Sequence, residues 1–249
     1  MSLPVSISPC PLVDAIVEIR FDTSVLPGAV FGIVYDTLKG MFHKATQLQM
    51  AAFPEEMRKS NPALLYQPHF RLESENLVAL VGPNVFAVGM LGEYPKWATL
   101  SQRIRDALAL MDKTGIIKTV HRFGLHYVNY FDRNILPDLE LRFFIGEKEV
   151  TGETTMFKTV LAREGYKQQL QVFTDLKVTP ISPTKKIDPN VLGSLIDIDC
   201  FQDYPTVGVD ILPAINDFME SAHLGEKELF FSLLTEDFLK TLNPIFPDN

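Results

Sequence analysis

Residues 70–90, "FRLESENLVALVGPNVFAVGM", contain three short apolar runs separated by two tight-turn signals. The signals are "SEN" at residues 74–76 and "GPN" at residues 82–84, where Gly, Pro and Asn supply the dihedral angles that a close chain reversal needs. Strands joined by such short turns run antiparallel, because parallel neighbours need a long crossover connection. The stretch therefore predicts an antiparallel meander.

The first half of the chain adds a strand and two helices to this meander. Residues 15–21, "AIVEIRF", alternate apolar and polar side chains with the period of two that a half-buried strand shows. Pro27 is suited to open a helix, since the first helical position does not use the missing N–H. A second helix, ended by Gly115, is predicted from one apolar stripe made of Trp97, Leu100, Ile104, Leu108 and Met111.

The second half of the chain also mixes strands with turn signals. Residues 119–131, "TVHRFGLHYVNYF", predict a strand, and residues 154–178 predict a hairpin that turns near Gly165. Residues 179–194 contain three prolines and predict a loop. Together these patterns predict an α+β fold with a mainly antiparallel sheet and long amphipathic helices packed on one face. Strict alternation of strand and helix is absent, which disfavours a doubly wound parallel sheet.

Two similar segments point to an internal relationship between the ends of the chain. "AIVEIRFD" at residues 15–22 and "LIDIDCFQD" at residues 195–203 each precede a proline-bearing connection and a helix, and Gly225 is predicted to end the second helix. We expect an N-terminal α+β lobe over residues 1–131 and a C-terminal α+β lobe with acidic helices over residues 132–249. The echo is short, so chance explains it as well as duplication does, and one domain or two both stay open.

Composition places the chain among globular proteins. Its 249 residues are 46% hydrophobic, and the longest apolar tract is interrupted at Gly82, too early for a membrane span. Cys10 and Cys200 lie far apart in apolar surroundings, as expected of structural thiols in a reducing compartment. The N-terminus lacks the basic and long apolar regions of a secretory signal. We therefore expect a cytoplasmic protein without a membrane partner.

Acidic residues are concentrated near the C-terminus. The net charge is −8, and residues 194–249 carry 11 Asp and Glu against 2 Lys and Arg. Such a segment repels nucleic acid, because binding a duplex requires clustered basic side chains. We expect no nucleic-acid partner. The acidic excess is either a solvated helix face or a docking surface for a basic protein.

Sequence motifs of common enzymes and of metal sites are missing. The chain has no phosphate-binding P-loop, no G-x-G-x-x-G, no G-x-S-x-G and no H-E-x-x-H motif. His121 and His126 are five apart on a predicted strand and so are expected on opposite faces. Asp197 and Asp199 share a strand face, which is either a solvated acidic edge or a cation site that needs further partners. We expect no metal and no cofactor.

Four side chains form the candidate ligand-binding site: Glu18, Arg20, Arg122 and His126. Glu18 and Arg20 point away from the apolar face of their strand, and Arg122 shares a face with His126. If those faces coincide in one sheet, the two guanidinium groups form a site for a carboxylate or phosphate, which they bind bidentately. The alternative is an ion pair of Glu18 with Arg20 or Arg122 on the sheet surface.

Several segments in order resemble an uncharacterised family of prokaryotic proteins of about this length that is sporadically distributed among genomes. They are "PLVDAIVEIRF", "GPNVFAVG" followed by "EYPKW", "HRFGLHYVN", and "LIDID" followed by "ESAHLGEKELFFSLLTEDF". The family strand reads Arg-x-Gly-Leu-Arg-Tyr-x-Asn, and this chain has His126 at the second arginine, which puts in doubt a role that needs permanent charge there. The resemblance implies no established activity. Its sporadic occurrence suggests accessory roles such as defence.

The sequence thus predicts a noncatalytic binding or regulatory protein that engages a protein partner or a small anionic ligand. The alternative is an enzyme or small-anion-binding protein with a site around Arg20, Arg122 and His126. A homo-oligomer remains open.

Overall fold

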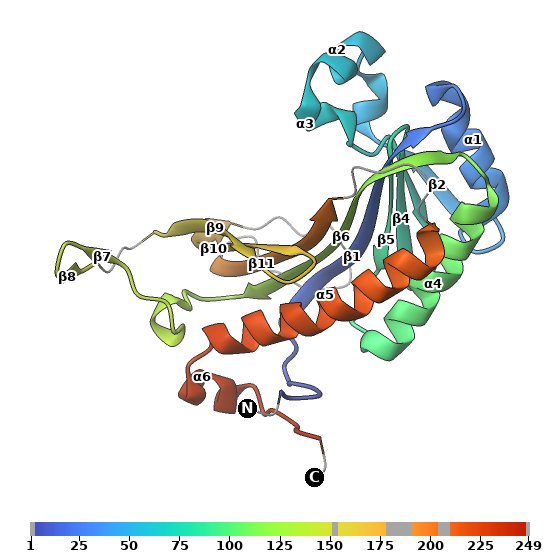
Figure 1. Ribbon diagram of the computed structural model, residues 1–249. Helices are drawn as coiled ribbons and strands as arrows, with labels where there is room; N and C mark the ends of the chain where they lie inside the picture. Colours follow the sequence, from blue (N-terminus) through green and yellow to red (C-terminus); the bar gives the residue numbers. More distant parts are fainter. Residues whose placement is uncertain (1–2, 151–153, 178–190, 204–209, 248–249) are drawn as a thin grey trace. The chain divides into compact units, whose positions relative to one another are not determined.

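The computed structural model describes residues 3–150, 154–177, 191–203 and 210–247 (Figure 1). The strands are β1 (Leu12–Thr23), β2 (Lys44–Gln47), β3 (Phe70–Glu73), β4 (Leu77–Gly82), β5 (Val85–Met90), β6 (Ile117–Phe131), β7 (Phe144–Ile145), β8 (Lys148–Glu149), β9 (Met156–Ala162), β10 (Lys167–Lys177) and β11 (Leu192–Asp203). The helices are α1 (Pro27–Leu38), α2 (Glu55–Ser60), α3 (Pro62–Leu65), α4 (Trp97–Lys113), α5 (Ile211–Leu233) and α6 (Glu236–Thr241), with short 3-10 turns η1 (Gln49–Ala52) and η2 (Leu136–Asp138).

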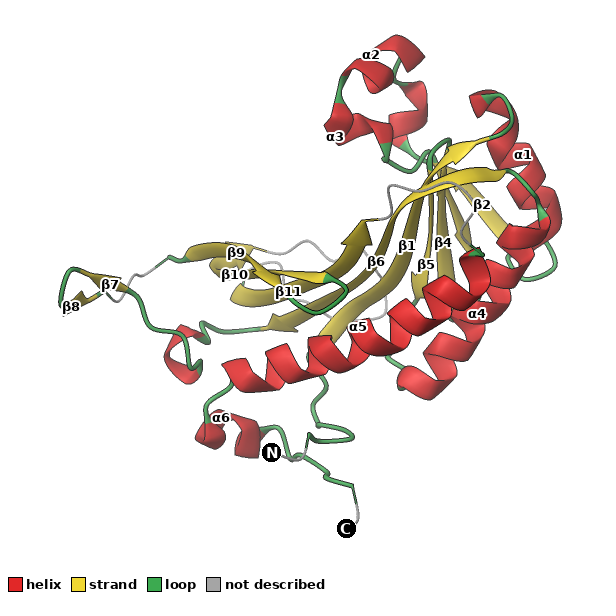
Figure 2. Ribbon diagram, viewed as in Figure 1, coloured by secondary structure: helices red, strands yellow, loops and turns green. Residues whose placement is uncertain are grey.

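Nine strands form one large antiparallel sheet, and helices complete an α+β fold as predicted (Figure 2). The strand order is β2-β3-β4-β5-β1-β6-β11-β10-β9, and β7 and β8 form a separate hairpin. The chain follows the same path twice through this order. In the first path, β1 lies beside β5, the last of the strands β3–β5, and helix α4 follows β5. In the second path, β6 lies beside β11, the last of the strands β9–β11, and helix α5 follows β11.

The chain divides into two compact units, each built from separate stretches of sequence. The large unit comprises Asp14–His126 and Phe201–Ser221. The small unit comprises Met1–Val13, Tyr127–Cys200 and Ala222–Asn249. Strands β1, β6 and β11 and helix α5 therefore contribute residues to both units.

The predicted meander at residues 70–90 is confirmed within the large unit. Strand β4 pairs antiparallel with β3 through Val81 and Phe70, and with β5 through Leu77 and Met90. Gly115 follows α4 with φ +65°, as expected of a residue that ends a helix. In the small unit, β9 and β10 form the predicted hairpin, and Gly165 turns it with φ +82°.

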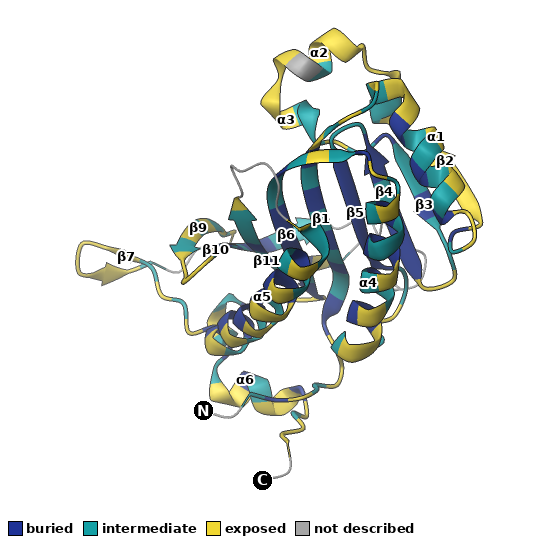
Figure 3. Ribbon diagram, turned by 45° about the vertical axis from the view of Figure 1, so that its right-hand side comes forward, coloured by how far each residue is buried: buried dark blue, intermediate teal, exposed yellow. Residues whose placement is uncertain are grey.

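One face of the sheet in the large unit is covered by helices and forms the core. Four alternate residues of β1 are almost completely buried, with relative exposures of 1% or less at Ala15, Val17, Ile19 and Phe21. Helix α1 packs against β4 and α4, and α4 packs against β5. Pro27 occupies the start of α1, as predicted, and the buried sides of α4 and the sheet are dark in Figure 3.

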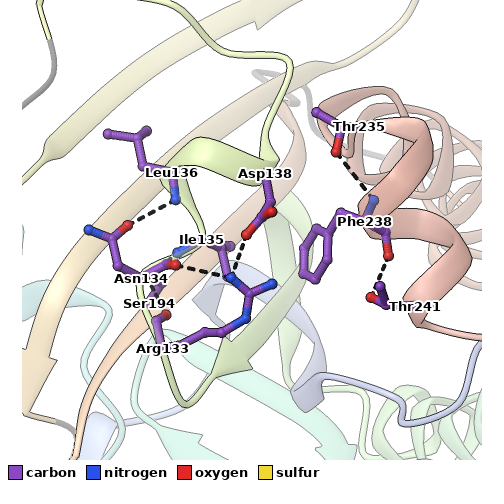
Figure 4. A network of polar contacts seen from close by, with 9 residues as sticks. All are labelled: Arg133, Asn134, Ile135, Leu136, Asp138, Ser194, Thr235, Phe238 and Thr241. Carbon is purple, nitrogen blue, oxygen red and sulfur yellow. Dashed lines mark hydrogen bonds and ion pairs between the residues drawn. The ribbon is translucent and has the colours of Figure 1, made fainter.

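In the small unit, one polar network joins the turn after β6 to β11 and α6 (Figure 4). The Ser194 hydroxyl donates to the Arg133 carbonyl oxygen at 2.9 Å and accepts from the Ile135 N–H at 3.3 Å. The Arg133 guanidinium pairs with Asp138 and lies 4.9 Å from the ring centroid of Phe238. These contacts satisfy backbone groups that the end of a strand leaves unpaired.

The expectation that Gly225 ends the last long helix is wrong, because α5 continues to Leu233. Gly225 is needed there for space: a Cβ atom at this position would lie 1.9 Å from the Tyr166 hydroxyl oxygen. Most of the loop predicted over residues 179–194 lies outside the described residues, and β11 already begins at Leu192. Among the helices in the described stretches, none combines the length and apolar character that crossing a membrane requires.

Close packing of β1 against β5 leads to a stability prediction for Gly89. A Cβ atom at Gly89 would lie 2.3 Å from the Ala15 carbonyl oxygen and 2.8 Å from the Ile16 Cα. Because these are main-chain atoms of a paired strand, we expect Gly89→Ala to lower the free energy of unfolding by about 1–3 kcal/mol in urea denaturation. Gly40→Ala is the matched control, since no atom lies within 4 Å of its Cβ position. Equal loss of stability in both variants would contradict this account.

Candidate functional site

The four predicted site residues all belong to the large unit, two on β1 and two on β6. On β1, Glu18 and Arg20 alternate with the buried residues Val17 and Ile19. Side chains of consecutive strand residues point to opposite faces. Glu18 and Arg20 therefore lie on the face of the sheet that α1 and α4 leave uncovered.

Strand β6 changes its face pattern partway along. Val120 and Phe123 are both buried, at 3% and 0% exposure, although a regular strand would place residues three apart on opposite faces. Phe123 faces α5, where its ring centroid lies 6.0 Å from that of Phe218. His121 and Arg122 between them are only half-buried. Both therefore point to the face opposite the helices.

The hydrogen bonds at the two ends of the β1–β6 pair differ in register by one position. Ser24 N–H donates to the Ile116 carbonyl at 2.8 Å, and Tyr130 N–H donates to the Pro11 carbonyl at 2.9 Å. Between these two links β6 advances 14 positions, from 116 to 130, while β1 advances 13, from 11 to 24. Half-buried His121 and Arg122 between the buried Val120 and Phe123 give the side-chain pattern of a β-bulge, in which two neighbouring residues lie on one side of the strand and the alternation shifts by one.

The bulge corrects one expectation about the histidines. His121 and His126 were expected on opposite faces because five positions separate them on a strand. Because the alternation shifts by one between them, His121 and His126 lie on the same face, opposite the buried Phe123 and Leu125. The same shift puts Arg122 on the face that carries Glu18 and Arg20.

Contacts on this face hold its charged groups in place. The Arg20 Nε donates to Glu18 Oε1 at 2.6 Å, which is one of the two ion pairs considered from the sequence. The Arg20 guanidinium carbon lies 5.1 Å from the ring centroid of Tyr66, and that of Arg122 lies 4.3 Å from the ring centroid of Phe201. Each cation–π contact contributes about 0.5–1 kcal/mol at a partly exposed position.

A second acid–base pair lies at the end of β1. His121 Nε2 lies 2.9 Å from Asp22 Oδ2. Burial raises the pKa of Tyr66, and the nearby charge of Asp22 adds to that rise while Arg20 opposes it. We name the six side chains of this face the polar sheet face: Glu18, Arg20, Asp22, His121, Arg122 and His126. Its guanidinium groups are ordered over aromatic rings, so binding a carboxylate would cost less side-chain entropy.

Metal binding finds no support within the part of the chain that the structure describes. There, no three His, Cys, Asp or Glu side chains gather as a metal site would require. Both cysteines are free thiols. Cys200 is buried as expected, and burial raises the pKa of its thiol to about 12. Cys10 is exposed, contrary to the apolar setting that its sequence neighbours suggested.

One contact in the large unit, between Arg58 and His69, was not expected from the sequence. The His69 side chain is 6% exposed, and Arg58 Nη1 lies 2.9 Å from its Nε2 and 3.1 Å from its Nδ1. Burial, followed by the charge of Arg58, lowers the pKa of His69 to about 4. His69 is therefore neutral at pH 7. No periodic pattern links two residues that are eleven apart and separated by the end of α2 and by α3, so the sequence contains no signal for this contact.

A buried carboxyl group in the small unit was also missed. Glu226 is 4% exposed, and burial raises its pKa to about 8, against the opposing charge of Lys227. The helical periodicity of α5 could have identified Glu226. It lies four residues after Ala222, on the apolar stripe that also contains Ile215. At pH 7 this carboxyl group is largely protonated.

His69 should make folding sensitive to acid. Its pKa is lower in the folded chain than the usual 6.5, so the unfolded chain binds a proton first and stability falls as the pH drops from 6.5 towards 4. We expect a loss approaching about 3 kcal/mol from this residue. Urea denaturation at several pH values should show a shallower loss for His69→Gln than for the unmodified chain. Parallel pH profiles would refute the assignment.

Glu226 should have the opposite pH dependence. Its folded pKa lies above the ordinary value of 4.5, so its stabilising contribution is complete below pH 4.5 and is lost as the pH rises through about 8. Glu226→Gln keeps the neutral shape, so its stability relative to the unmodified chain should rise by roughly 2–4 kcal/mol between pH 5 and pH 8. Denaturation curves at those two pH values test this. A constant difference would mean that Glu226 is not held neutral.

Comparison with known proteins adds no assignment: the chain matches no family model and no curated protein.

Proposed function

We propose that this chain is a noncatalytic binding protein whose polar sheet face engages an acidic segment of a partner protein. The observation that carries the proposal is the ordering of Arg20 and Arg122 over the rings of Tyr66 and Phe201. Two fixed guanidinium groups on one sheet face suit the recognition of carboxylates, because each offers a rigid fork of donors.

The openness of this face favours a macromolecular partner over a small molecule. None of the six side chains lines the cavity bounded by Phe31, His69 and Phe70 or the cavity bounded by Asn134, Leu141 and Val150. Small-molecule sites are enclosed and mostly apolar, whereas protein interfaces are broad, and aromatic and arginine side chains are enriched there. Glu18 and Arg20 are about a quarter to a third exposed, so they are ordered and still accessible.

We further propose that the two halves of the chain are related lobes, each with its long helix packed on the same side of the sheet. The repeated path of β1, β3–β5 and α4 and of β6, β9–β11 and α5 supports this relationship. In that scheme Arg20 and Arg122 come from equivalent strands, which are neighbours at the centre of the sheet. Duplication would thus supply both cations of the polar sheet face.

Fluorescence anisotropy with a labelled octaglutamate peptide tests the binding function. We expect octaglutamate to bind at physiological salt while octaglutamine does not. Arg122→Gln should weaken binding by about tenfold, since a hydrogen bond to a charged group contributes about 1.5–3 kcal/mol. Arg103→Gln, on α4, makes the same charge change elsewhere and serves as the control.

The outcomes separate specific recognition from general charge attraction. Equal weakening by Arg122→Gln and Arg103→Gln would mean that only net charge matters and would overturn the proposal. Failure of octaglutamate to bind the unmodified chain would overturn it as well. Thermal melting of both variants confirms that each is folded when binding is measured.

A further inference from the structure

A cavity of about 270 Å³ lies in the large unit beside the start of α1. None of the six residues of the polar sheet face lines it. Its walls include Gly28, Phe31, Arg58, His69 and Phe70. The volume is close to the lower end of the range for small-ligand pockets, which begins near 300 Å³.

One wall of the cavity is aromatic and apolar. The rings of Phe31 and Phe70 are stacked, with centroids 3.6 Å apart and planes inclined by 14°. Val81, which pairs with Phe70 across β3 and β4, adds a buried aliphatic side chain to the lining. A planar apolar group packs well against such a wall, because aromatic rings prefer parallel offset or edge contacts.

Arg58 adds a positively charged group to the lining of this cavity. Its guanidinium is half-buried, and within the described stretches no carboxylate lies at ion-pair distance from it. His69 occupies only Nη1 and, with its pKa lowered to about 4, carries no charge at pH 7. A neutral imidazole has a single acceptor nitrogen, so His69 can accept only one of the five N–H donors of Arg58. A half-buried cation of this kind is stabilised by a bound anion.

Glu55 is the acidic side chain of this lining and weakens the attraction for an anion. It is exposed, in the first turn of α2, so water and salt screen its charge more than that of half-buried Arg58. Removing this charge should therefore strengthen anion binding without creating it.

We propose that this cavity binds a small organic anion, in which a carboxylate or phosphate group contacts Arg58 and a flat apolar body packs on Phe31 and Phe70. This site is independent of the polar sheet face and would stand if that function failed. His69 is a positioning residue, because it holds the Arg58 guanidinium at the cavity wall without adding a competing charge.

Isothermal titration with four probes tests both halves of the proposed ligand. Benzoate and phenyl phosphate carry the anion and the ring, inorganic phosphate lacks the ring, and benzyl alcohol lacks the charge. We expect at least one of the first two to bind with a Kd of about 1 mM or below, and the last two at least about tenfold more weakly. Tighter binding of benzoate or of phenyl phosphate identifies the anionic group.

Two glycines of α1 provide a matched pair of variants. At both Gly28 and Gly32 no atom lies within 4 Å of an added Cβ, so the first side-chain carbon fits at either position. Only Gly28 lines the cavity, so Gly28→Leu should fill it and abolish binding, whereas Gly32→Leu should leave binding unchanged. Both should keep or raise the melting temperature, because Leu is a better helix former than Gly.

Further variants separate this site from the polar sheet face. Arg58→Gln should weaken binding of the better probe at least about tenfold, and Glu55→Gln should strengthen it. Arg122→Gln should leave it unchanged. The proposal is overturned if neither benzoate nor phenyl phosphate binds below about 10 mM. It is also overturned if inorganic phosphate binds as tightly as phenyl phosphate, or if Gly28→Leu binds like the unmodified chain.

Discussion

The central constraint on this protein is that β1 and β6 bury the same side of the sheet under helices. Val17, Ile19 and Phe21 on β1 and Phe123 and Leu125 on β6 are all essentially inaccessible to water. Burying each such side chain stabilises the fold by about 1.5–3 kcal/mol, so the alternation cannot slip by a residue. Every polar side chain between these positions is consequently directed to the other face. The polar sheet face is thus a consequence of core packing.

The bulge in β6 decides which polar groups share that face. In a regular strand every second side chain lies on the same face, so His121 would lie on the face opposite Arg122. With the bulge, two neighbouring residues point the same way, and the Asp22–His121 pair joins the Glu18–Arg20 pair on one surface. Bulges commonly redirect side chains near binding sites in this way. Here the local irregularity brings charged groups of two strands together.

The ionisable groups of this fold lie in two kinds of environment. Arg20 lies against a carboxylate partner and an aromatic ring, whereas His69 and Glu226 are held neutral because burial disfavours their charged forms. Neutral His69 leaves the charge of Arg58 available in the cavity. The burial that makes stability depend on pH at His69 is therefore also what keeps this residue from adding a second positive charge beside Arg58.

Sequence alone determined the meander, the start of α1, the turn at Gly165 and the α+β class, because each follows from local periodicity or from the dihedral needs of Gly and Pro. It also placed Glu18 opposite the apolar face of β1. Tertiary structure decided the rest. The change of face between Val120 and Phe123 shows only in which residues the folded chain buries, and Gly225 is explained by the approach of Tyr166. Arg58 meets His69 only after the intervening segment folds back. Such features arise from contacts between distant segments, which no local pattern encodes.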